Sequence, residues 1–254
     1  MTLMADNIHP TAIIGENVKI GSNNTICENV IIEGNVTIGN DNYIGPFSHI
    51  ANNVEIKDCN KFFGQISIGS LGEMGSKGDV FIEDGKVEIG SHNVFREFIT
   101  VNSPVRKKAT KIGNHCYFMA RSHIPHDAII MNNVVMATNS IIGGGCVIHD
   151  FAYIGLGSIT HQWLIVGESS MLGMNSVNTK NIPPYCIVIG VPSIISGLNH
   201  VGASRRGYSK EDVDEAIKEM PLMIKGAKET VNPISQSIAD FVMNNENTLT
   251  RLKA

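Results

Sequence analysis

An apolar residue, most often isoleucine, recurs at almost every sixth position of this chain, and this period restricts the fold more than any other feature. The repeat is interrupted at about residue 70 and again at 103–111, and it resumes after each interruption. A fixed hexapeptide repeat is typical of a parallel β-helix, in which one side chain per short strand points into the core. The repeat positions are Ile8, Ile14, Ile20, Ile26, Ile32, Ile38, Ile44, Ile50, Ile56, Phe62 and Ile68, then Ile89, Phe95 and Val101, then Ile112, Phe118, Ile124, Ile130, Met136, Ile142, Ile148, Ile154, Thr160, Val166 and Leu172.

Three hexapeptides complete one coil, so the repeat predicts a triangular prism with about 18 residues per coil. Chance alternation in a β-sandwich does not explain why every repeat position from Ile8 to Ile68 is isoleucine or phenylalanine. Hexapeptide families wind this helix left-handed, against the usual right-handed preference of parallel crossovers. We predict a mostly β fold, a left-handed parallel β-helix over 1–190. Loops at about 70–88 and 103–111 then project from its corners, where binding functions are commonly found.

The C-terminal part of the sequence lacks the repeat and carries helix signals instead. In SKEDVDEAIKEM, Ser209 is a candidate N-cap and acidic residues occupy the first turn. Asn232–Pro233 separates this segment from a second apolar stretch at helical spacing. We predict that 191–254 is an α-helical appendage, mostly helical from residue 209.

Composition and charge argue against several functional classes. The net charge of −4 does not suit a general nucleic-acid or membrane binder. The start MTLMADNIHP lacks the basic and apolar regions of a signal peptide, and no apolar run approaches the roughly 20 residues of a membrane span. The five cysteines are scattered without a CxxC pair, which is typical of reduced thiols rather than a disulfide framework or zinc site. We expect a cytoplasmic protein without a cofactor or metal.

The segment RSHIPHD holds the most informative polar residues. With 18 residues per coil, His126 lies beside Gly144 on the next coil, and Gln162 follows one coil further, each step being about 4.8 Å. His123 and His161 occupy neighbouring positions. The repeat therefore predicts a polar column on one outer face of the prism.

The residues alone leave three interpretations of these histidines open. They are solvated surface residues, or metal ligands, or a proton-transfer unit. A metal site of the γ-carbonic-anhydrase kind would need paired His-x4-His spacing and a distant third ligand, which this sequence lacks. Proton transfer suits imidazole, which titrates near neutral pH and is oriented by a neighbouring aspartate. Adjacent strand residues point to opposite faces, so a role for Asp127 requires a corner at that position.

The segments IHPTAIIGENVKIG, HIPHDAII, THQWLIVG, NIPPYCIVIG and ASRRGYSKEDV together resemble the UDP-N-acetylglucosamine O-acyltransferase family, which opens lipid A biosynthesis. The resemblance covers essentially the whole chain, including the loops and the helical tail. Single hexapeptides are shared by many acyltransferases. The combination of H-x2-H-D, HQ and RRG-(F/Y)-S is much more specific.

This resemblance implies a reaction and a set of roles. His126 would take the proton of the sugar 3-hydroxyl as that oxygen attacks an acyl thioester, and Asp127 would support the imidazole. The backbone N–H of Gly144 would donate to the developing oxyanion. Further contacts are implied for His123, His161 and Gln162 on the sugar and pantetheine path, for Lys77 at the sugar or a phosphate, and for Asn199, Arg205 and Arg206 at the nucleotide.

The resemblance also implies partners. The donor would be acyl carrier protein, which is acidic, and Arg106, Lys107, Lys108 and Lys111, with Arg121, are either a basic patch for it or a solvated loop. The active unit would be a homotrimer with sites between subunits. Met174 falls in the acyl groove, where glycine would leave more room, so we expect a short to medium acyl chain. The alternative is that Met174 fills a gap in the core.

Three positions depart from the family pattern. Gly145 stands where members usually have a histidine, Val201 where they carry an acid, and VNSP at 101–104 replaces an IHRG-like segment. Each departure concerns acceptor recognition rather than the base. The rival prediction is therefore an N- or O-acyltransferase for a different nucleotide-linked amino sugar. A metal-binding γ-carbonic-anhydrase-like protein and a non-catalytic scaffold are further alternatives.

Overall fold

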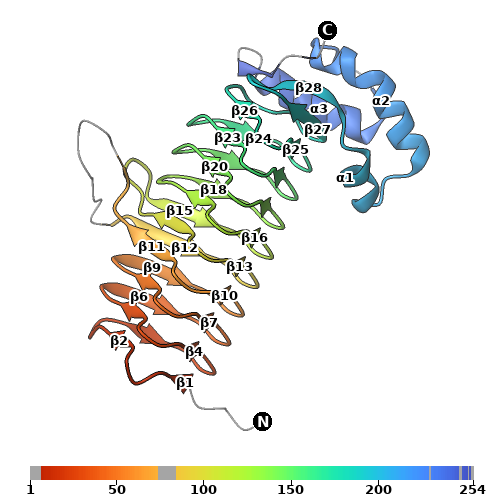
Figure 1. Ribbon diagram of the computed structural model, residues 1–254. Helices are drawn as coiled ribbons and strands as arrows, with labels where there is room; N and C mark the ends of the chain where they lie inside the picture. The colour runs from red at the N-terminus through yellow and green to blue at the C-terminus, as the bar shows by residue number, and fades with distance from the viewer. Residues whose placement is uncertain (1–6, 74–83, 229, 246–247, 251, 253–254) are drawn as a thin grey trace.

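The structure, a computed structural model, describes residues 7–73, 84–228, 230–245, 248–250 and 252. The chain winds into stacked coils of short strands, and helices lie at the C-terminal end of the stack (Figure 1). Strands of successive coils pair in parallel and form three long sheets. The fold is a left-handed parallel β-helix with a C-terminal helical part, as the hexapeptide repeat predicts.

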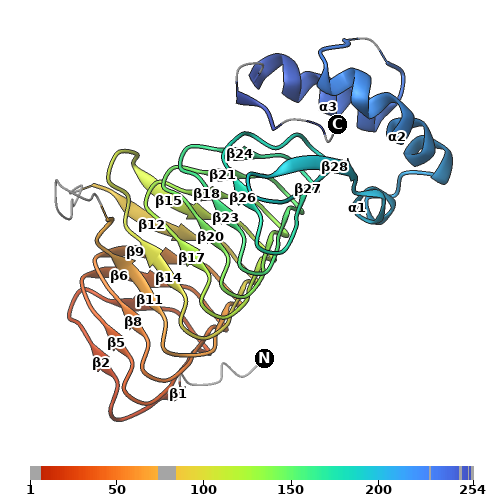
Figure 2. The same ribbon diagram turned by 45° about the horizontal axis from the view of Figure 1, so that its top comes forward.

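The three sheets are the faces of a prism, and each coil contributes one strand to each face (Figure 2). The first sheet contains β1 (Asn7–Ile8), β4 (Thr25–Ile26), β7 (Tyr43–Ile44), β10 (Lys61–Phe62), β13 (Val94–Phe95), β16 (Tyr117–Phe118), β19 (Val135–Met136), β22 (Tyr153–Ile154), β25 (Met171–Leu172), β27 (Cys186–Ile189) and β28 (Ile194–Leu198). The second contains β2 (Ile13–Ile14), β5 (Ile31–Ile32), β8 (His49–Ile50), β11 (Ser67–Ser70), β14 (Thr100–Asn102), β17 (His123–Ile124), β20 (Ile141–Ile142), β23 (Ile159–Thr160) and β26 (Val177–Asn178). The third contains β3 (Lys19–Ile20), β6 (Asn35–Ile38), β9 (Asn53–Ile56), β12 (Lys86–Ile89), β15 (Ala109–Ile112), β18 (Ile129–Ile130), β21 (Val147–Ile148) and β24 (Ile165–Val166).

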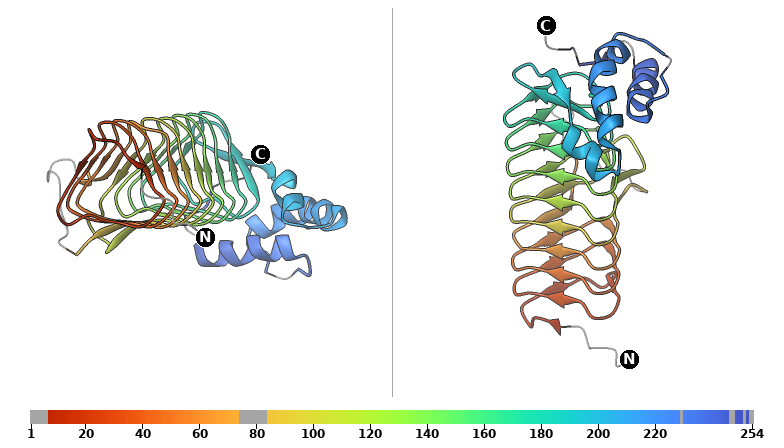
Figure 3. Two further views of the ribbon diagram at one scale, coloured as in Figure 1. Left: turned by 90° about the horizontal axis from the view of Figure 1, so that it is seen from below. Right: turned by 90° about the vertical axis from the view of Figure 1, so that its right-hand side faces the viewer.

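The register follows the repeat, because hydrogen bonds between coils join residues 18 apart over most of the stack. This separation rises to 33 residues across the first insertion and to 23 across the second. The coils therefore keep their outline along the axis despite both insertions (Figure 3). The predicted loop ranges, 70–88 and 103–111, include residues that belong to strands. Strand β11 extends to Ser70, and Lys86 at the start of β12 pairs with Ala109 at the start of β15.

From Ile26 to Leu172 the repeat residues are buried in the interior, and many coil corners have left-handed backbone. Phe62, Phe95 and Phe118 are fully buried and stack with ring centroids 4.7 and 4.8 Å apart. One corner column consists of Asp127, Gly145 and Trp163, whose φ angles are 63°, 72° and 63°. Left-handed backbone is uncommon outside glycine and asparagine. Asp127 and Trp163 therefore face directions that a strand would not give them.

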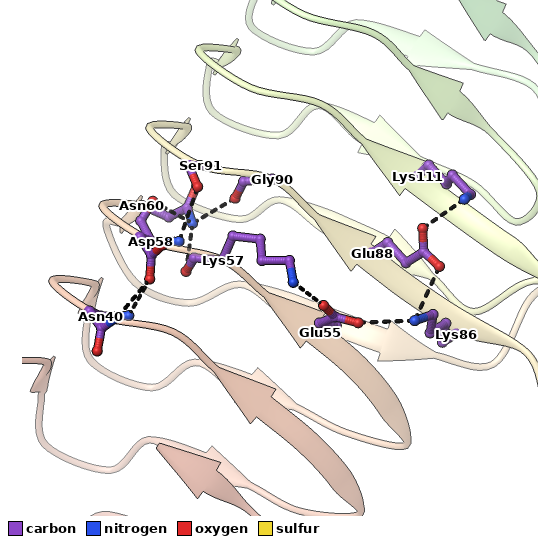
Figure 4. A network of polar contacts seen from close by, with 10 residues as sticks. All are labelled: Asn40, Glu55, Lys57, Asp58, Asn60, Lys86, Glu88, Gly90, Ser91 and Lys111. Carbon is purple, nitrogen blue, oxygen red and sulfur yellow. Dashed lines mark hydrogen bonds and ion pairs between the residues drawn. The ribbon is translucent and has the colours of Figure 1, made fainter. Parts of the chain in front are cut away.

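Asparagines form a buried ladder between the N-terminal coils. The side-chain oxygen of Asn42 accepts the backbone N–H of Asn60, and that of Asn60 accepts the N–H of Asn93, both at 2.9 Å. The amide nitrogen of Asn60 donates to the carbonyl of Gly90, also at 2.9 Å (Figure 4). The ladder thus satisfies polar groups that the coil turns would otherwise bury without partners.

Replacing Asn60 with alanine is expected to lower the free energy of unfolding by about 3 kcal/mol, because buried partners on three coils lose their hydrogen bonds. Asn40→Ala removes an exposed rung of the neighbouring ladder and is expected to cost less than about 1 kcal/mol. Denaturant-induced unfolding of the two variants measures the difference. Equal, small losses would contradict this role of the ladder.

Ion pairs on the third sheet join the strands beside the insertions (Figure 4). Lys86 contacts Glu55 at 2.9 Å and Glu88 at 3.3 Å, and Lys111 contacts Glu88 at 2.7 Å. Such exposed pairs contribute little individually. Lys111 is thus paired with Glu88, which leaves the residues at 106–108, without an ion pair among the described residues, as the loop part of the expected basic patch.

The C-terminal segment begins with strand β28, which pairs antiparallel with β27, and helices follow. They are α1 (His200–Arg205), α2 (Lys210–Ile224) and α3 (Pro233–Asn245). Ser209 caps α2 and forms a capping box with Asp212, as its sequence predicts. Helix α1 precedes the predicted start at residue 209, because Asn199 caps it by accepting the N–H of Gly202. Among the described residues, no helix is both long and apolar enough to cross a membrane.

Candidate active site

The turn between β17 and β18 carries the histidine–aspartate pair at the corner between the second and third sheets. The carbonyl of His126 accepts the N–H of Gly145 at 3.0 Å, and the carbonyl of Gly144 accepts the N–H of Trp163 at 2.9 Å. Three successive coils are therefore joined at this corner. His126, Gly144 and Gln162 follow one another in the order that the 18-residue coil predicts.

Asp127 and His126 face each other although they are adjacent in sequence. The Nδ1 atom of His126 lies 2.8 Å from Oδ2 of Asp127, whose side chain is fully buried. The left-handed backbone at Asp127 makes this possible, because it turns the carboxylate back toward the preceding residue. The corner that a role for Asp127 requires is therefore present.

The second loop holds the other oxygen of Asp127. Oδ1 accepts the backbone N–H groups of Val105, Arg106 and Lys107 at 3.1, 3.0 and 2.7 Å. Burial favours the protonated carboxyl, but the N–H groups of the loop and the His126 imidazole outweigh it, so the pKa of Asp127 lies below its ordinary value. An ionised carboxylate only accepts, which places the proton of the neutral imidazole on Nδ1 and the lone pair on Nε2.

Gly144 lies directly against the imidazole. A Cβ atom at this position would be 2.5 Å from Cε1 and 2.7 Å from Nε2 of His126, so any side chain would displace the ring. Among the described residues, no hydrogen-bond acceptor lies at the backbone N–H of Gly144. This N–H is therefore a donor that remains for a ligand beside the base.

His123 lies on β17 near the pair, and its Nδ1 atom is 2.7 Å from the hydroxyl of Thr100. Burial lowers the pKa of His123; the nearby Glu73 carboxylate opposes this effect and the His126 side chain adds to it. Burial lowers the pKa of His149 in the same way. The fold thus favours the neutral form of both rings.

The unfolded chain binds more protons at these two histidines. The free energy of unfolding is therefore expected to rise with pH as both imidazoles lose their protons. The stability that the two neutral histidines allow is fully present above their ordinary pKa of 6.5, and it is lost as the pH falls below that value. Thermal unfolding between pH 7.5 and 5 measures this loss. The variant His123→Gln, His149→Gln is expected to lose less stability than the wild type over that range. An identical loss in both proteins would contradict the assignment.

The Trp163 indole accounts for the glycine at position 145, one of the three departures from the family pattern. Gly145 has a φ of 72°, and a Cβ there would lie 2.2 Å from the indole of Trp163. The indole therefore fills the space that a side chain at position 145 would need. Lys107 and Arg106 lie over the same indole, at 5.4 and 5.7 Å from its centre.

His161 and Gln162 lie on the adjacent coil and are exposed. The Nδ1 atom of His161 is 3.2 Å from the carbonyl of Gln162. Both side chains thus lie at the surface beside the corner, where a substrate can reach them.

The residues expected at the nucleotide lie on another face. Asn199, Arg205 and Arg206 line a pocket of about 500 Å³ between α1 and the outer side of the first sheet, and Val201 gives it an apolar wall. The guanidinium of Arg206 lies 3.2 Å from the ring centre of Phe151. A corner between the second and third sheets is opposite the first sheet of a triangular prism. One chain therefore does not bring this pocket to His126.

Met174 and Lys77 are the two remaining candidate site residues. Met174 is 72% exposed at a turn after β25, which excludes the alternative that it fills the core. Lys77 lies outside the described residues. Among the described residues, no cluster of three histidine, cysteine or acidic side chains is arranged to hold a metal ion.

Sequence reasoning missed Trp163 and the contacts of the second loop. Trp163 lies one coil after Gly145, so the repeat itself places it at this corner. The loop amides on Asp127 and the Thr110 hydroxyl, which accepts the Asp127 N–H at 2.9 Å, have no comparable signal because they belong to the insertion or its edge.

Comparisons with known proteins agree with this fold. The bacterial transferase hexapeptide family (six repeats) matches residues 109–144, and the second domain of UDP N-acetylglucosamine O-acyltransferase matches residues 181–249. The acyl-(acyl-carrier-protein)–UDP-N-acetylglucosamine O-acyltransferases of Campylobacter concisus and Aliarcobacter butzleri are each 34% identical to the chain. The first alignment covers 84% of this chain and 80% of that protein, and the second 84% and 81%.

Solved structures agree as well. The UDP-N-acetylglucosamine O-acyltransferase of Moraxella catarrhalis superimposes with a TM-score of 0.82 at 27% identity, covering 94% of this chain and 93% of that one. The UDP-N-acetylglucosamine acyltransferase of Francisella novicida shares the fold, with a TM-score of 0.86 at 24% identity over 96% and 94% of the two chains. Fold and repeat define a hexapeptide-repeat transferase. The chain belongs to the UDP-N-acetylglucosamine O-acyltransferase family.

Proposed function

We propose that this protein transfers an acyl chain from acyl carrier protein to the 3-hydroxyl of UDP-N-acetylglucosamine, the step that opens lipid A biosynthesis, in the cytoplasm. The observation that carries the proposal is the His126–Asp127 pair, which presents the Nε2 lone pair beside the N–H of Gly144. A base next to an oxyanion donor is what acyl transfer to a hydroxyl requires. Family membership supplies the donor and the acceptor.

The mechanism follows from these atoms. Nε2 of His126 takes the 3-hydroxyl proton while the sugar oxygen attacks the thioester carbon, and the Gly144 N–H stabilises the oxyanion. Asp127 stabilises the imidazolium that forms. The carbon–sulfur bond then breaks, and the imidazolium returns its proton to the pantetheine thiolate. His123, His161 and Gln162 contact the sugar and pantetheine in this proposal.

The active unit is a homotrimer whose sites lie between subunits. Its support is the opposite placement of the base corner and the pocket of Asn199, Arg205 and Arg206 on one prism. A neighbouring copy can place its pocket against this corner, and three copies close the ring. Acyl carrier protein, being acidic, approaches the exposed Lys108 of the second loop.

Subunit mixing tests this arrangement. His126→Gln and the double variant Arg205→Ala, Arg206→Ala are each expected to show little transfer. Mixed trimers made by co-expression are expected to recover about a quarter of the wild-type rate, because one interface in four receives both intact halves. Mixtures no more active than the separate variants would contradict shared sites.

Met174 sets the acyl length in this proposal, because its side chain is exposed and would enter the acyl groove that the family resemblance implies. Met174→Gly is expected to shift preference toward donors several methylenes longer, since each methylene fills space that the side chain vacates. Competition among acyl carrier proteins with graded chains measures the shift, and Asn175→Gly is the control. An unchanged length profile in Met174→Gly would contradict the role.

A further inference from the structure

The second loop contacts the catalytic corner in two ways at once. Its backbone N–H groups at Val105, Arg106 and Lys107 converge on one oxygen of Asp127. The side chains of two of these residues turn to the next coils, where both cations lie over the Trp163 indole. Lys107 also reaches the carbonyl of Gly145 at 3.5 Å. The loop is therefore held between Asp127 and Trp163.

Trp163 is itself fixed in place. Its backbone N–H donates to the carbonyl of Gly144, its backbone is left-handed, and its indole packs on Gly145, which has no side chain to displace it. The residue is nevertheless 41% exposed, so burial alone does not account for an indole here. Its aromatic face attracts two cations that would otherwise leave the loop anchored only by its backbone.

We propose that Trp163 is a positioning residue for the base: by holding Arg106 and Lys107 it keeps the loop amides on Asp127, and Asp127 keeps His126 oriented. This deepens the proposed function and rests on His126 being its base. The role would divide the basic residues of the loop between two tasks. Arg106 and Lys107 serve the corner, and Lys108 is left to face acyl carrier protein.

The first test needs no turnover. Hydrogen exchange of the segment 103–108 is measured by mass spectrometry in wild type, Trp163→Leu and Trp163→Phe. Exchange is expected to be about tenfold faster in Trp163→Leu, because the leucine side chain has no aromatic face for the cations. Trp163→Phe keeps such a face and is expected to remain near the wild type. Equal exchange in all three proteins would overturn the proposal, even if the protein had no transferase activity.

The second test asks whether Trp163 acts through Asp127. Trp163→Leu is expected to lower kcat about tenfold, with KM for both substrates nearly unchanged, because a loosened base is misplaced. In an Asp127→Asn background the same change is expected to alter kcat less than about twofold, because residue 127 no longer holds His126 in the reactive tautomer. A full tenfold loss in both backgrounds, or a change confined to KM, would overturn the proposal. Absence of transfer by the wild type would instead count against the proposed function.

A second variant covers the case in which Trp163→Leu does not fold. Lys107→Met removes one cation and keeps the backbone and most of the side-chain bulk. It is expected to speed exchange of 103–108 and to lower kcat about threefold with KM unchanged. Wild-type exchange and kcat in this variant would contradict the proposal.

Discussion

His126→Gln is expected to lower the rate of acyl transfer about a thousandfold. A general base contributes between a hundredfold and ten-thousandfold in most enzymes, and the His126 imidazole is held by a buried carboxylate at the corner. Glutamine fills part of the same space but cannot take up the proton. The binding of both substrates is expected to change little, because their other proposed contacts lie on neighbouring coils and on α1.

The matched control is His115→Gln. His115 is exposed and stacks on His92 at a ring distance of 4.8 Å, on another corner of the prism. This variant is expected to keep the wild-type kcat and KM in the same steady-state assay. A loss below about tenfold in His126→Gln would contradict the assignment of the base.

Asp127→Asn is expected to lower kcat about a hundredfold while the fold is kept. The asparagine oxygen can still accept the loop N–H groups, so its NH₂ group then faces Nδ1 of His126. That contact requires Nδ1 to accept, which moves the ring proton to Nε2 and removes the lone pair from the reacting side. The loss arises from the wrong tautomer rather than from a missing side chain.

Thermal unfolding separates this effect from destabilisation. Asp127→Asn is expected to lose some stability, because three N–H groups then donate to a neutral oxygen instead of a charged one. Thr110→Val removes the acceptor of the Asp127 N–H and serves as the control for local strain at this turn. Similar kcat values in the aspartate variant and the wild type would contradict the tautomer argument.

The sequence predicted what depends on the repeat. The 18-residue coil placed His126, Gly144 and Gln162 on consecutive coils, because position in a parallel β-helix follows from counting. The same counting could have found Trp163. It could not show that Asp127 faces His126, which depends on a left-handed corner, nor that loop amides meet its carboxylate. Insertions follow no repeat, so counting residues cannot predict their contacts.

The residues at α1 show a different limit. The resemblance assigned Asn199, Arg205 and Arg206 to the nucleotide, and the structure gathers them at one pocket. Neither the motif nor the repeat indicates that this pocket lies on the face opposite His126. That separation is visible only when the helical segment is placed against the first sheet, and it is what makes a second subunit necessary for the proposed site.

The most direct measurement is a competition between two acceptors, UDP-N-acetylglucosamine and its 3-amino analogue, with acyl carrier protein as the acyl donor. Mass spectrometry identifies the product, and mild alkali cleaves an ester but leaves an amide. The account predicts an alkali-labile ester on UDP-N-acetylglucosamine that is lost in His126→Gln. Product formed only on the amine, or formed equally by His126→Gln, would contradict it.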